Sequence, residues 1–210
     1  VMDNKKIAVI GGGAAGLMAS CRAAELGATV TVFERNDLLA MKLGITGKGR
    51  CNLTNSCSPE EFVRNVTQNG KFLFSAIHRF TPQDTIDYFE ALGVPLKVER
   101  GNRVFPVSDR ATDIVLALKN HMLDLGCRVI HERVTGLESE NESITAVLTE
   151  KHRYAGFDSV ILCTGGVSYP VTGSTGDGFV IAKALGHTVT ELIPSLVGLT
   201  CAGDLCARMQ

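Results

Sequence analysis

Apolar residues near the start of the chain follow two patterns, continuous runs and helical spacing. The runs at 7–10 (IAVI) and 29–33 (TVTVF) have the length of strands that are buried on both faces of a sheet. Between them, Leu17 and Cys21 lie on one face of an expected helix, and Gly27 marks its end. The order strand, glycine turn, helix, strand predicts a βαβ unit and therefore a parallel sheet.

Helical patterns dominate the middle of the chain, from about residue 58 to residue 126. Ser58 and Thr81 each precede a proline, and acidic residues follow, which is the usual composition of a helix N-terminus. Ser108 is expected to cap a third, longer helix, in which apolar residues recur at helical spacing up to Gly126. We therefore expect a helical excursion over 58–126 inside a larger domain.

Short strands return after the third helix. The segments 127–132 and 159–166 each contain a brief apolar run, and we expect both to be strands, the second one buried. Between them, alternating segments with a turn at 140–142 predict a small antiparallel meander. A last helix is expected at 177–186. The pattern predicts an α/β fold with a parallel sheet and a small antiparallel β-meander crossover, in a domain of residues 1–195.

The composition is that of a globular domain. Of the 210 residues, 45% are hydrophobic and 20% are charged, and the formal net charge is −1. A near-neutral chain lacks the basic surface that binds nucleic acid or anionic membranes. No apolar run has the length of a transmembrane helix, and the N-terminus lacks a signal-peptide pattern. We expect a soluble, cytoplasmic protein with no nucleic-acid or membrane partner.

Seven cysteines and five histidines raise the question of a metal or disulfide framework. No two cysteines form a C-x-x-C pair, and no histidine lies four residues from another. An odd number of cysteines without a secretory signal is typical of free thiols in a reducing compartment. The sequence therefore predicts no metal site.

The glycine turn after the first strand has the spacing G-x-G-x-x-G, formed by Gly11, Gly13 and Gly16. In this motif the first glycine permits the tight turn, the second lets a pyrophosphate approach the backbone, and the third lets the helix pack on the strand. Ala14 and Ala15 complete the turn, where free N–H groups and the positive end of the helix dipole attract phosphate. The motif predicts a Rossmann-like dinucleotide site.

An acidic residue follows the second strand at the position that such a site requires. Glu34 lies 18 residues after Gly16, and its carboxylate can accept hydrogen bonds from both ribose hydroxyls. The next residue, Arg35, has two interpretations: it lies along the adenine face, or it is a solvated surface arginine.

Three features favour FAD over NAD as the dinucleotide. The glycine motif opens the chain, as it does when the dinucleotide is a resident cofactor. The expected meander is typical of flavin-dependent folds, whereas an NAD dehydrogenase more often alternates strand and helix throughout. The final strand ends in Thr164, Gly165 and Gly166, a second glycine turn that can approach the cofactor.

With these pieces assembled, the chain resembles the bacterial aminoacetone-oxidase family of FAD-binding flavoproteins, which includes proteins implicated in bile-acid reduction. The resemblance extends over nearly all of the chain. Five blocks carry it: GGGAAGLMAS (11–20), KLGITGKGRCNLTN (42–55), GNRVFPVSDRA (101–111), TGGVSYPVTGSTGDGFVIAKALGHT (164–188) and PSLVGL (194–199).

The resemblance assigns a place to the glycine-rich segment 42–54, which follows the second strand and is expected to run as a loop beside the inner half of FAD. Thr46 and Asn52 are then expected to hydrogen-bond to the ribityl chain or the flavin. Lys42 and Arg50 are expected to bring positive charge near the pyrophosphate or an anionic flavin.

Two further residues, Val134 and Cys51, complete the expected site, and Asp177 has a structural interpretation. Val134 is expected to meet the adenine edge through its backbone. Cys51 lies near the flavin, either as a redox partner or as a packed thiol. Asp177 is interpreted as an acid in the first turn of the last helix, where it favours the helix dipole.

The resemblance implies an FAD-dependent oxidoreductase that transfers a hydride between flavin and a small organic substrate, an amine or an unsaturated acid. NAD(P)H as a co-substrate, or O₂, would close the cycle, and no catalytic residue is assigned. Family members continue into a substrate-side domain, so residues 196–210 are expected to be the start of a truncated second domain. The alternatives are a non-catalytic dinucleotide-binding fragment and an RNA-modifying flavoprotein.

Overall fold

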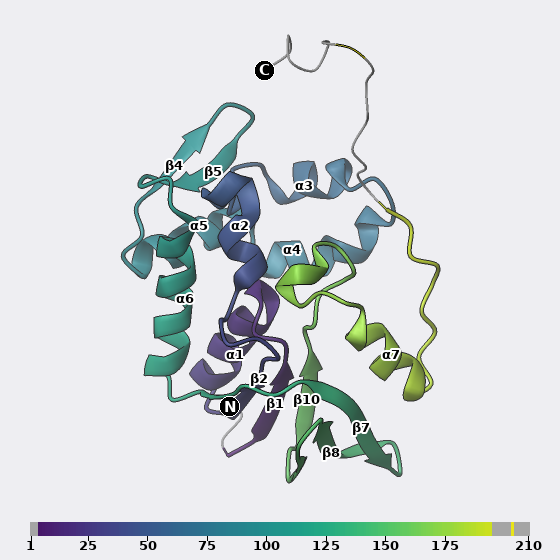
Figure 1. Cartoon of the computed structure of the whole chain (residues 1–210). Helices are drawn as coiled ribbons and strands as arrows, with labels where there is room; N and C mark the ends of the chain where they lie inside the picture. The colour runs from purple at the N-terminus through teal and green to yellow at the C-terminus, as the bar shows by residue number, and fades with distance from the viewer. Residues whose placement is uncertain (1–3, 195–202, 204–210) are drawn as a thin grey trace.

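A four-stranded parallel sheet forms the centre of the computed structural model, which describes residues 4–194 and residue 203 (Figure 1). Its strand order is β10-β1-β2-β6. All three neighbouring pairs are parallel, which confirms the expected parallel sheet. The strands are β1 (Lys6–Ile10), β2 (Thr29–Phe33), β6 (Arg128–Ile130) and β10 (Ser159–Leu162).

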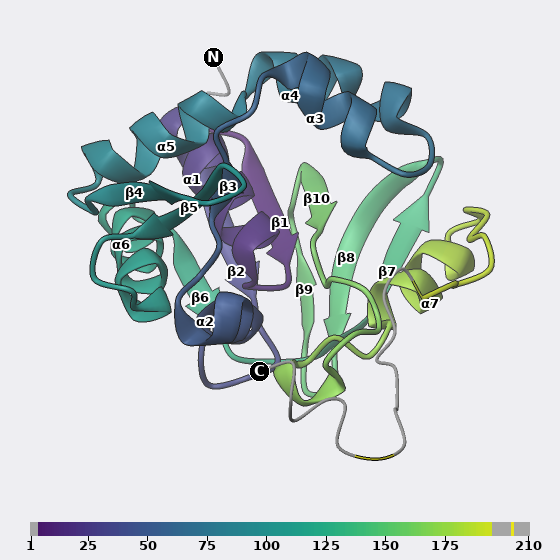
Figure 2. The same cartoon turned by 90° about the horizontal axis from the view of Figure 1, so that it is seen from above.

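Two helices cover one face of this sheet, α1 (Ala14–Glu25) and α6 (Ala111–Asp124), as Figure 2 shows. Ile7 and Val9 of β1 belong to the core on the helix side, whereas Ala8 and Ile10 belong to the core on the opposite side. This alternation is what a strand buried on both faces requires. The helices contribute Leu17, Ile114, Leu118 and Met122, each 1% exposed or less.

An antiparallel sheet covers the other face, with the order β7-β8-β9. It is the expected meander, and its strands are β7 (Val134–Glu140), β8 (Ser143–Thr149) and β9 (Arg153–Ala155). Phe33 at the end of β2 joins the two sheets. The centre of its ring lies 5.1 Å from that of Tyr154 and 6.0 Å from that of Phe157, both in edge-on arrangements. These contacts fix the end of β2 against the meander.

The middle of the chain contains the three expected helices, and two of them have the expected caps. Ser58 Oγ accepts a hydrogen bond from the Glu61 amide, and Thr81 forms a capping box with Asp84. The third cap differs from the prediction, because Arg110 is the N-cap of α6 and Ser108 Oγ accepts only from the Arg110 amide. The helices between residue 58 and α6 are α3 (Pro59–Asn65), the 3-10 helix η1 (Gly70–Leu73), α4 (Phe74–Arg79) and α5 (Pro82–Ala91).

A small antiparallel sheet also lies within the excursion that was expected to be helical. It has the order β3-β5-β4, and its strands are β3 (Thr54–Asn55), β4 (Leu96–Glu99) and β5 (Arg103–Pro106). The turn between β4 and β5 contains Gly101 and Asn102, both with positive φ. A Gly-Asn pair between two apolar segments is a hairpin signal, so the sequence did contain the information for this sheet.

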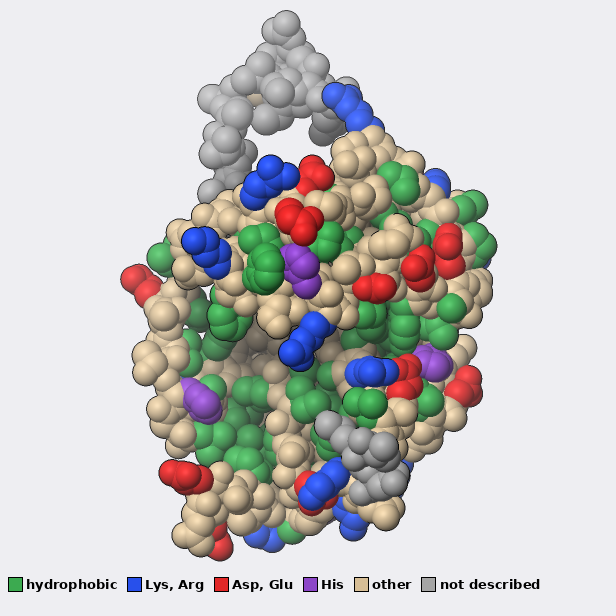
Figure 3. Space-filling model, turned by 180° about the vertical axis from the view of Figure 1, so that it is seen from behind, with side chains coloured by type: hydrophobic (Ala, Val, Ile, Leu, Met, Phe, Trp, Pro, Cys, Tyr) green, Lys and Arg blue, Asp and Glu red, His purple; other side chains and the backbone are tan. Residues whose placement is uncertain are grey.

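β10 is more exposed than its apolar sequence predicts. It was expected to be buried, yet Leu162 is 38% exposed, and β1 is its only partner within the described residues. Side chains around this edge, including Val160, Leu185 and Val189, line a second cavity of about 410 Å³. Seen from behind, the molecule has a hollow in which hydrophobic side chains gather (Figure 3). A connecting 3-10 helix, η2 (Pro170–Thr172), and α7 (Asp177–Ala184) follow β10.

None of the helices in residues 4–194 combines the length and the apolar character needed to cross a membrane. The expected start of a second domain, residues 196–210, lies outside the described residues apart from residue 203. The proposed domain boundary at residue 195 therefore stays a prediction.

Candidate functional site

A cavity of about 600 Å³ opens at the carboxyl ends of the parallel strands. Ile10, Phe33 and Leu162 contribute to its wall from the ends of β1, β2 and β10. Ligands of open α/β sheets bind at this edge, where the loops after the strands converge. Eleven of the residues expected to bind the cofactor line this cavity: Gly11, Gly13, Ala14, Ala15, Glu34, Arg35, Lys42, Thr46, Val134, Thr164 and Gly165.

The three glycines of the motif occupy three different environments. Gly11 has φ +102°, and a Cβ there would lie 2.4 Å from the Cys163 carbonyl oxygen. A Cβ on Gly16 would lie 1.8 Å from the Gly11 carbonyl oxygen, since α1 packs directly on the turn. A Cβ on Gly13, however, would meet no heavy atom of the described residues within 4 Å. Gly13 thus leaves open space on the cavity wall, where a ligand can approach the backbone.

The N-terminus of α1 faces the same space. Gly13 is the N-cap residue and offers no side chain to the first N–H groups, and Gly13, Ala14 and Ala15 line the cavity. No acidic residue lies in the first turn of α1. The amide donors and the positive end of the helix dipole are therefore available to an anion such as a pyrophosphate.

Glu34 is held in place by three hydrogen bonds. Its Oε2 accepts from the Gly12 amide at 2.8 Å, and its Oε1 accepts from both the amide and the side-chain Nδ2 of Asn36, each at 2.8 Å. Only 8% of Glu34 is exposed. The Asn36 carbonyl oxygen lies 2.7 Å from His131 Nδ1, which joins the ends of β2 and β6. The carboxylate is thereby fixed on the cavity wall beside the glycine turn.

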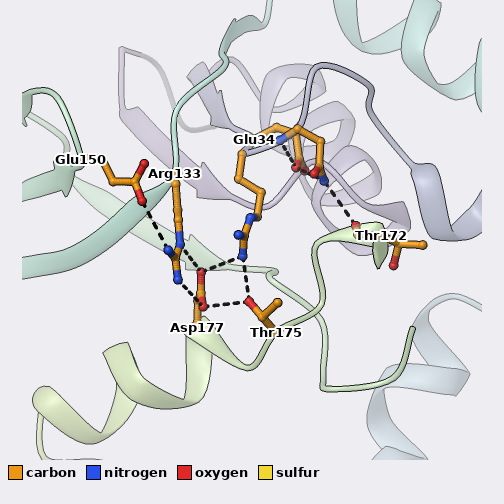
Figure 4. Close-up of polar contacts among 8 residues, drawn as sticks. Glu34, Arg133, Glu150, Thr172, Thr175 and Asp177 are labelled. Carbon is orange, nitrogen blue, oxygen red and sulfur yellow. Dashed lines mark hydrogen bonds and ion pairs between the residues drawn. The ribbon is translucent and has the colours of Figure 1, made fainter. Parts of the chain in front are cut away.

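Two arginines and one aspartate meet at the start of α7 (Figure 4). Arg133 binds Asp177 with both Nε and Nη2, at 2.9 and 3.1 Å, and Arg35 Nη1 donates to Asp177 at 3.2 Å. Arg35 Nη1 also donates to Thr175 Oγ1 at 2.7 Å. The hydrogen bonds from Arg133 lower the pKa of Asp177 more than its other contacts do.

This cluster bears on two interpretations made from the sequence. Asp177 is more than a first-turn acid, because its carboxylate joins β2, β7 and α7 at the rim of the cavity. Arg35 is fixed by ion pairing rather than free in solvent. Arg133 was missed altogether. The sequence signal nearest to this cluster was the block at 164–188, which carries much of the family resemblance and contains Thr175 and Asp177. That block does not include Arg133.

The segment after β2 was expected to be a loop but contains a short helix, α2 (Met41–Gly49), with no buried residue. Its helical geometry breaks at residues 46–48. Lys42 Nζ donates to Ser174 Oγ at 2.6 Å, and Thr46 Oγ1 donates to the Leu43 carbonyl at 2.7 Å. The Ala40 amide donates to the Gly12 carbonyl at 2.8 Å, so α2 begins directly beside the glycine turn.

Five of the expected site residues lie outside the cavity lining: Gly16, Arg50, Cys51, Asn52 and Gly166. Arg50 donates to Asp109 and Glu99, and its guanidinium lies 4.2 Å from the centre of the Phe105 ring. Its positive charge is therefore neutralised on the small sheet rather than turned toward the cavity. Cys51 is fully buried, and burial raises the pKa of its thiol. The structure supports the packed-thiol alternative for Cys51.

Among residues 4–194, no cluster of three or more His, Cys, Asp or Glu side chains is arranged to hold a metal ion. The polar groups that line the cavity are instead backbone amides, hydroxyls, carboxylates and the cations of Arg35, Lys42 and Arg133, and this set suits a nucleotide.

Comparisons with known proteins agree with this architecture. The model of the HI0933-like protein Rossmann domain matches residues 5–204. The chain is 32% identical over 208 residues to the 3-dehydro-bile acid delta(4,6)-reductase of Clostridium scindens, covering 92% of this chain and 47% of the relative. It is 31% identical over 196 residues to the ribosomal RNA dihydrouridine synthase of Haemophilus influenzae, covering 91% and 48%.

A solved structure supports the fold alone. The L-proline dehydrogenase from P. horikoshii superposes with a TM-score of 0.53 at 16% identity, covering 90% of this chain and 57% of that one. The chain spans about half the length of the curated relatives it matches. The match to a bile-acid reductase confirms the resemblance expected from the sequence. The chain belongs to the HI0933-like Rossmann-domain family.

Proposed function

We propose that this chain is the FAD-binding part of a flavin-dependent oxidoreductase. The observation that carries the proposal is the open space at Gly13, on the uncapped N-terminus of α1 and inside a cavity of about 600 Å³. A side chain would fill this space, whereas a pyrophosphate can use both the space and the amide donors around it.

The other cavity residues divide into an adenosine end and a flavin end. Glu34 would accept hydrogen bonds from the ribose hydroxyls, and Val134, at the start of β7, would meet the adenine edge. Lys42 would place a positive charge beside the phosphates, and Thr46 on α2 would contact the flavin end. Bound FAD would supply the hydride-transfer chemistry, and these residues would bind and orient it.

The names of the relatives favour a reductase. A delta(4,6)-reductase and a dihydrouridine synthase both add hydrogen across a carbon–carbon double bond of their substrates. We infer that the whole protein reduces such a bond in a small unsaturated molecule, with NAD(P)H as the electron source. An amine substrate with O₂ as the acceptor is the weaker alternative, because neither of these relatives is named for it.

A second candidate substrate is RNA. Two relatives, at 31% and 28% identity, are ribosomal RNA dihydrouridine synthases. The net charge of −1 argues against RNA as a partner of this part of the protein, since RNA affinity normally depends on a basic surface. Salt-sensitive binding of ribosomal RNA fragments to the purified chain would favour this candidate over a small molecule.

The direct test of the proposal is uptake of FAD. The purified chain is mixed with FAD, freed of excess cofactor and examined for the visible absorbance of protein-bound flavin. A retained flavin spectrum supports the proposal, and a chain that stays colourless contradicts it. Reduction of the retained flavin by NAD(P)H or by an amine then separates the two electron sources, and no reduction by either favours the non-catalytic alternative.

Replacing Arg50 with alanine should destabilise the fold without weakening FAD binding. Arg50 joins the end of α2 to Glu99 on the small sheet and to Asp109 just after it, and Arg50 does not line the cavity. We expect Arg50→Ala to lower the melting temperature and to leave the FAD dissociation constant within about twofold of the original.

Arg103→Ala is the matched control, because Arg103 lies near the same Phe105 ring, at 5.7 Å, and within residues 4–194 its side chain donates only to the Arg100 carbonyl. It should lower the melting temperature less than Arg50→Ala does. Weaker FAD binding by Arg50→Ala, at an unchanged melting temperature, would contradict this prediction and would support the contact between Arg50 and the cofactor that was expected from the sequence.

A further inference from the structure

Residues 165–176 connect β10 to α7 and run along one side of the cavity; we call this segment the strap. Thr172, Gly173 and Ser174 of the strap line the cavity. Residues of the segment that follows β2, 35–42, line the same cavity. The strap and this segment are far apart in sequence and meet on the cavity wall.

Side chains of residues 35–42 donate hydrogen bonds to the strap. Arg35 donates to Thr175 Oγ1 at 2.7 Å, and Asn36 Nδ2 donates to the Thr172 carbonyl at 3.2 Å. Lys42 donates to Ser174 Oγ at 2.6 Å. These bonds fasten the strap to residues 35–42 along the wall of the cavity.

The end of the strap is held by a charged junction. Asp177, directly after the strap, binds Arg35 from the end of β2 and Arg133 from the segment between β6 and β7. Thr175 Oγ1 also donates to Asp177 Oδ1 at 2.9 Å. One carboxylate therefore fastens the strap to two separate parts of the sheet (Figure 4).

The strap has glycines at its ends and little apolar packing. Gly165 and Gly176 both have positive φ, +73° and +87°, and can serve as hinges. Val167, Tyr169 and Val171 project outward and are between 48% and 84% exposed. A segment that buries few apolar side chains is held mainly by its polar contacts and opens at low cost in free energy.

We propose that the strap is the gate of the cofactor site, and that Asp177 with Arg35 and Arg133 is its latch. The inference rests on the proposed FAD function, since lifting the strap would widen the way by which a dinucleotide enters or leaves. Asp177 is a positioning residue in this account, because it acts on the cofactor through the strap. Releasing the latch speeds entry and exit together, whereas the loss of a direct cofactor contact speeds exit alone.

The test measures both rates of FAD exchange by stopped-flow flavin fluorescence. Binding is followed after mixing the chain with FAD, and release is followed by trapping FAD with an excess of another FAD-binding apoprotein. Asp177→Asn, which keeps the shape of the side chain, should raise both rates about fivefold or more, the effect expected for loss of a charged hydrogen-bond partner. It should also increase hydrogen exchange of the strap amides in the FAD-free chain.

Two further variants make the test specific. Thr175→Val removes one fastening on the strap and leaves the carboxylate in place, so it should change both rates in the same direction. Asp113→Asn is the control: it breaks an Asp–Arg pair on α6, with Arg110, whose residues do not line the cavity. Its rates should match those of the unmodified chain.

The outcomes distinguish a failure of the gate from a failure of the proposed function. FAD uptake with unchanged rates in Asp177→Asn and Thr175→Val overturns the gate and leaves the cofactor site standing. A faster release at an unchanged binding rate also overturns it, because Asp177 would then act as part of the wall. If the unmodified chain takes up no FAD, the proposed function fails, and the gate fails with it.

Discussion

Gly13→Ala should abolish most FAD binding while leaving the protein folded. The added methyl group would project into open space within the cavity, where no heavy atom of the described residues lies within 4 Å. The same methyl group would occupy the position that we assign to the pyrophosphate. We expect the FAD dissociation constant to rise about ten- to a hundredfold, because steric overlap between the methyl group and the pyrophosphate costs a few kcal/mol.

The folded state should tolerate this change. Gly13 has φ −78° and ψ −172°, an extended conformation that alanine adopts freely. Alanine is a poorer N-cap than glycine but restricts the unfolded chain, so the free energy of unfolding should change by less than about 1 kcal/mol. FAD titration and urea unfolding of the same sample check both halves of this prediction. Unchanged FAD affinity would remove the observation on which the proposed function depends.

The glycine motif and the first βαβ unit could be predicted from the sequence because both depend on local patterns. The run at 7–10, the helical spacing after Gly13 and the run at 29–33 each determine one element, and their order leaves few possible arrangements. The caps at Ser58 and Thr81 are equally local, since each involves residues within one turn. The expected glycine turn therefore lies where the strand ends meet the cavity.

The parts that were missed depend on residues far apart in the chain. Arg35, Arg133 and Asp177 meet only because β2, β7 and α7 converge, and no spacing rule connects them. Arg50 was placed near the cofactor because it is a cation in a glycine-rich segment. Its partners are Glu99, on a sheet that was not predicted, and Asp109, in the segment that follows that sheet.

The exposure of β10 was missed for a related reason. An apolar run indicates that a strand can be buried, but it does not say which neighbours will cover it. In the described residues β10 has β1 on one side only, and Val160 and Leu162 line the second cavity. Burial is a property of the assembled sheet, so a prediction from one strand alone could not supply it.

Gly16→Ala should have the opposite effect to Gly13→Ala, since it should unfold or strongly destabilise the chain. A Cβ at Gly16 would lie 1.8 Å from the Gly11 carbonyl oxygen, far inside van der Waals contact. The Gly11 backbone has little room to move. Its amide donates to the Phe33 carbonyl at 2.8 Å, and the Cys163 backbone lies directly beside its Cα. The helix α1 would have to move away from β1 and from the core that contains Leu17.

The expected change in stability is the difference between a gain in helix propensity and the cost of a steric clash. Alanine inside a helix gains about 1 kcal/mol over glycine from helix propensity alone. Forcing two backbone segments apart in a close-packed core costs more, about 3 kcal/mol or above. We therefore expect Gly16→Ala to lower the free energy of unfolding by at least about 2 kcal/mol, measured by urea unfolding with circular dichroism. Gly13→Ala adds the same methyl group three residues earlier and is the matched control. Equal stability of the two variants would contradict the close approach of α1 to the glycine turn, on which the geometry of the cofactor site depends.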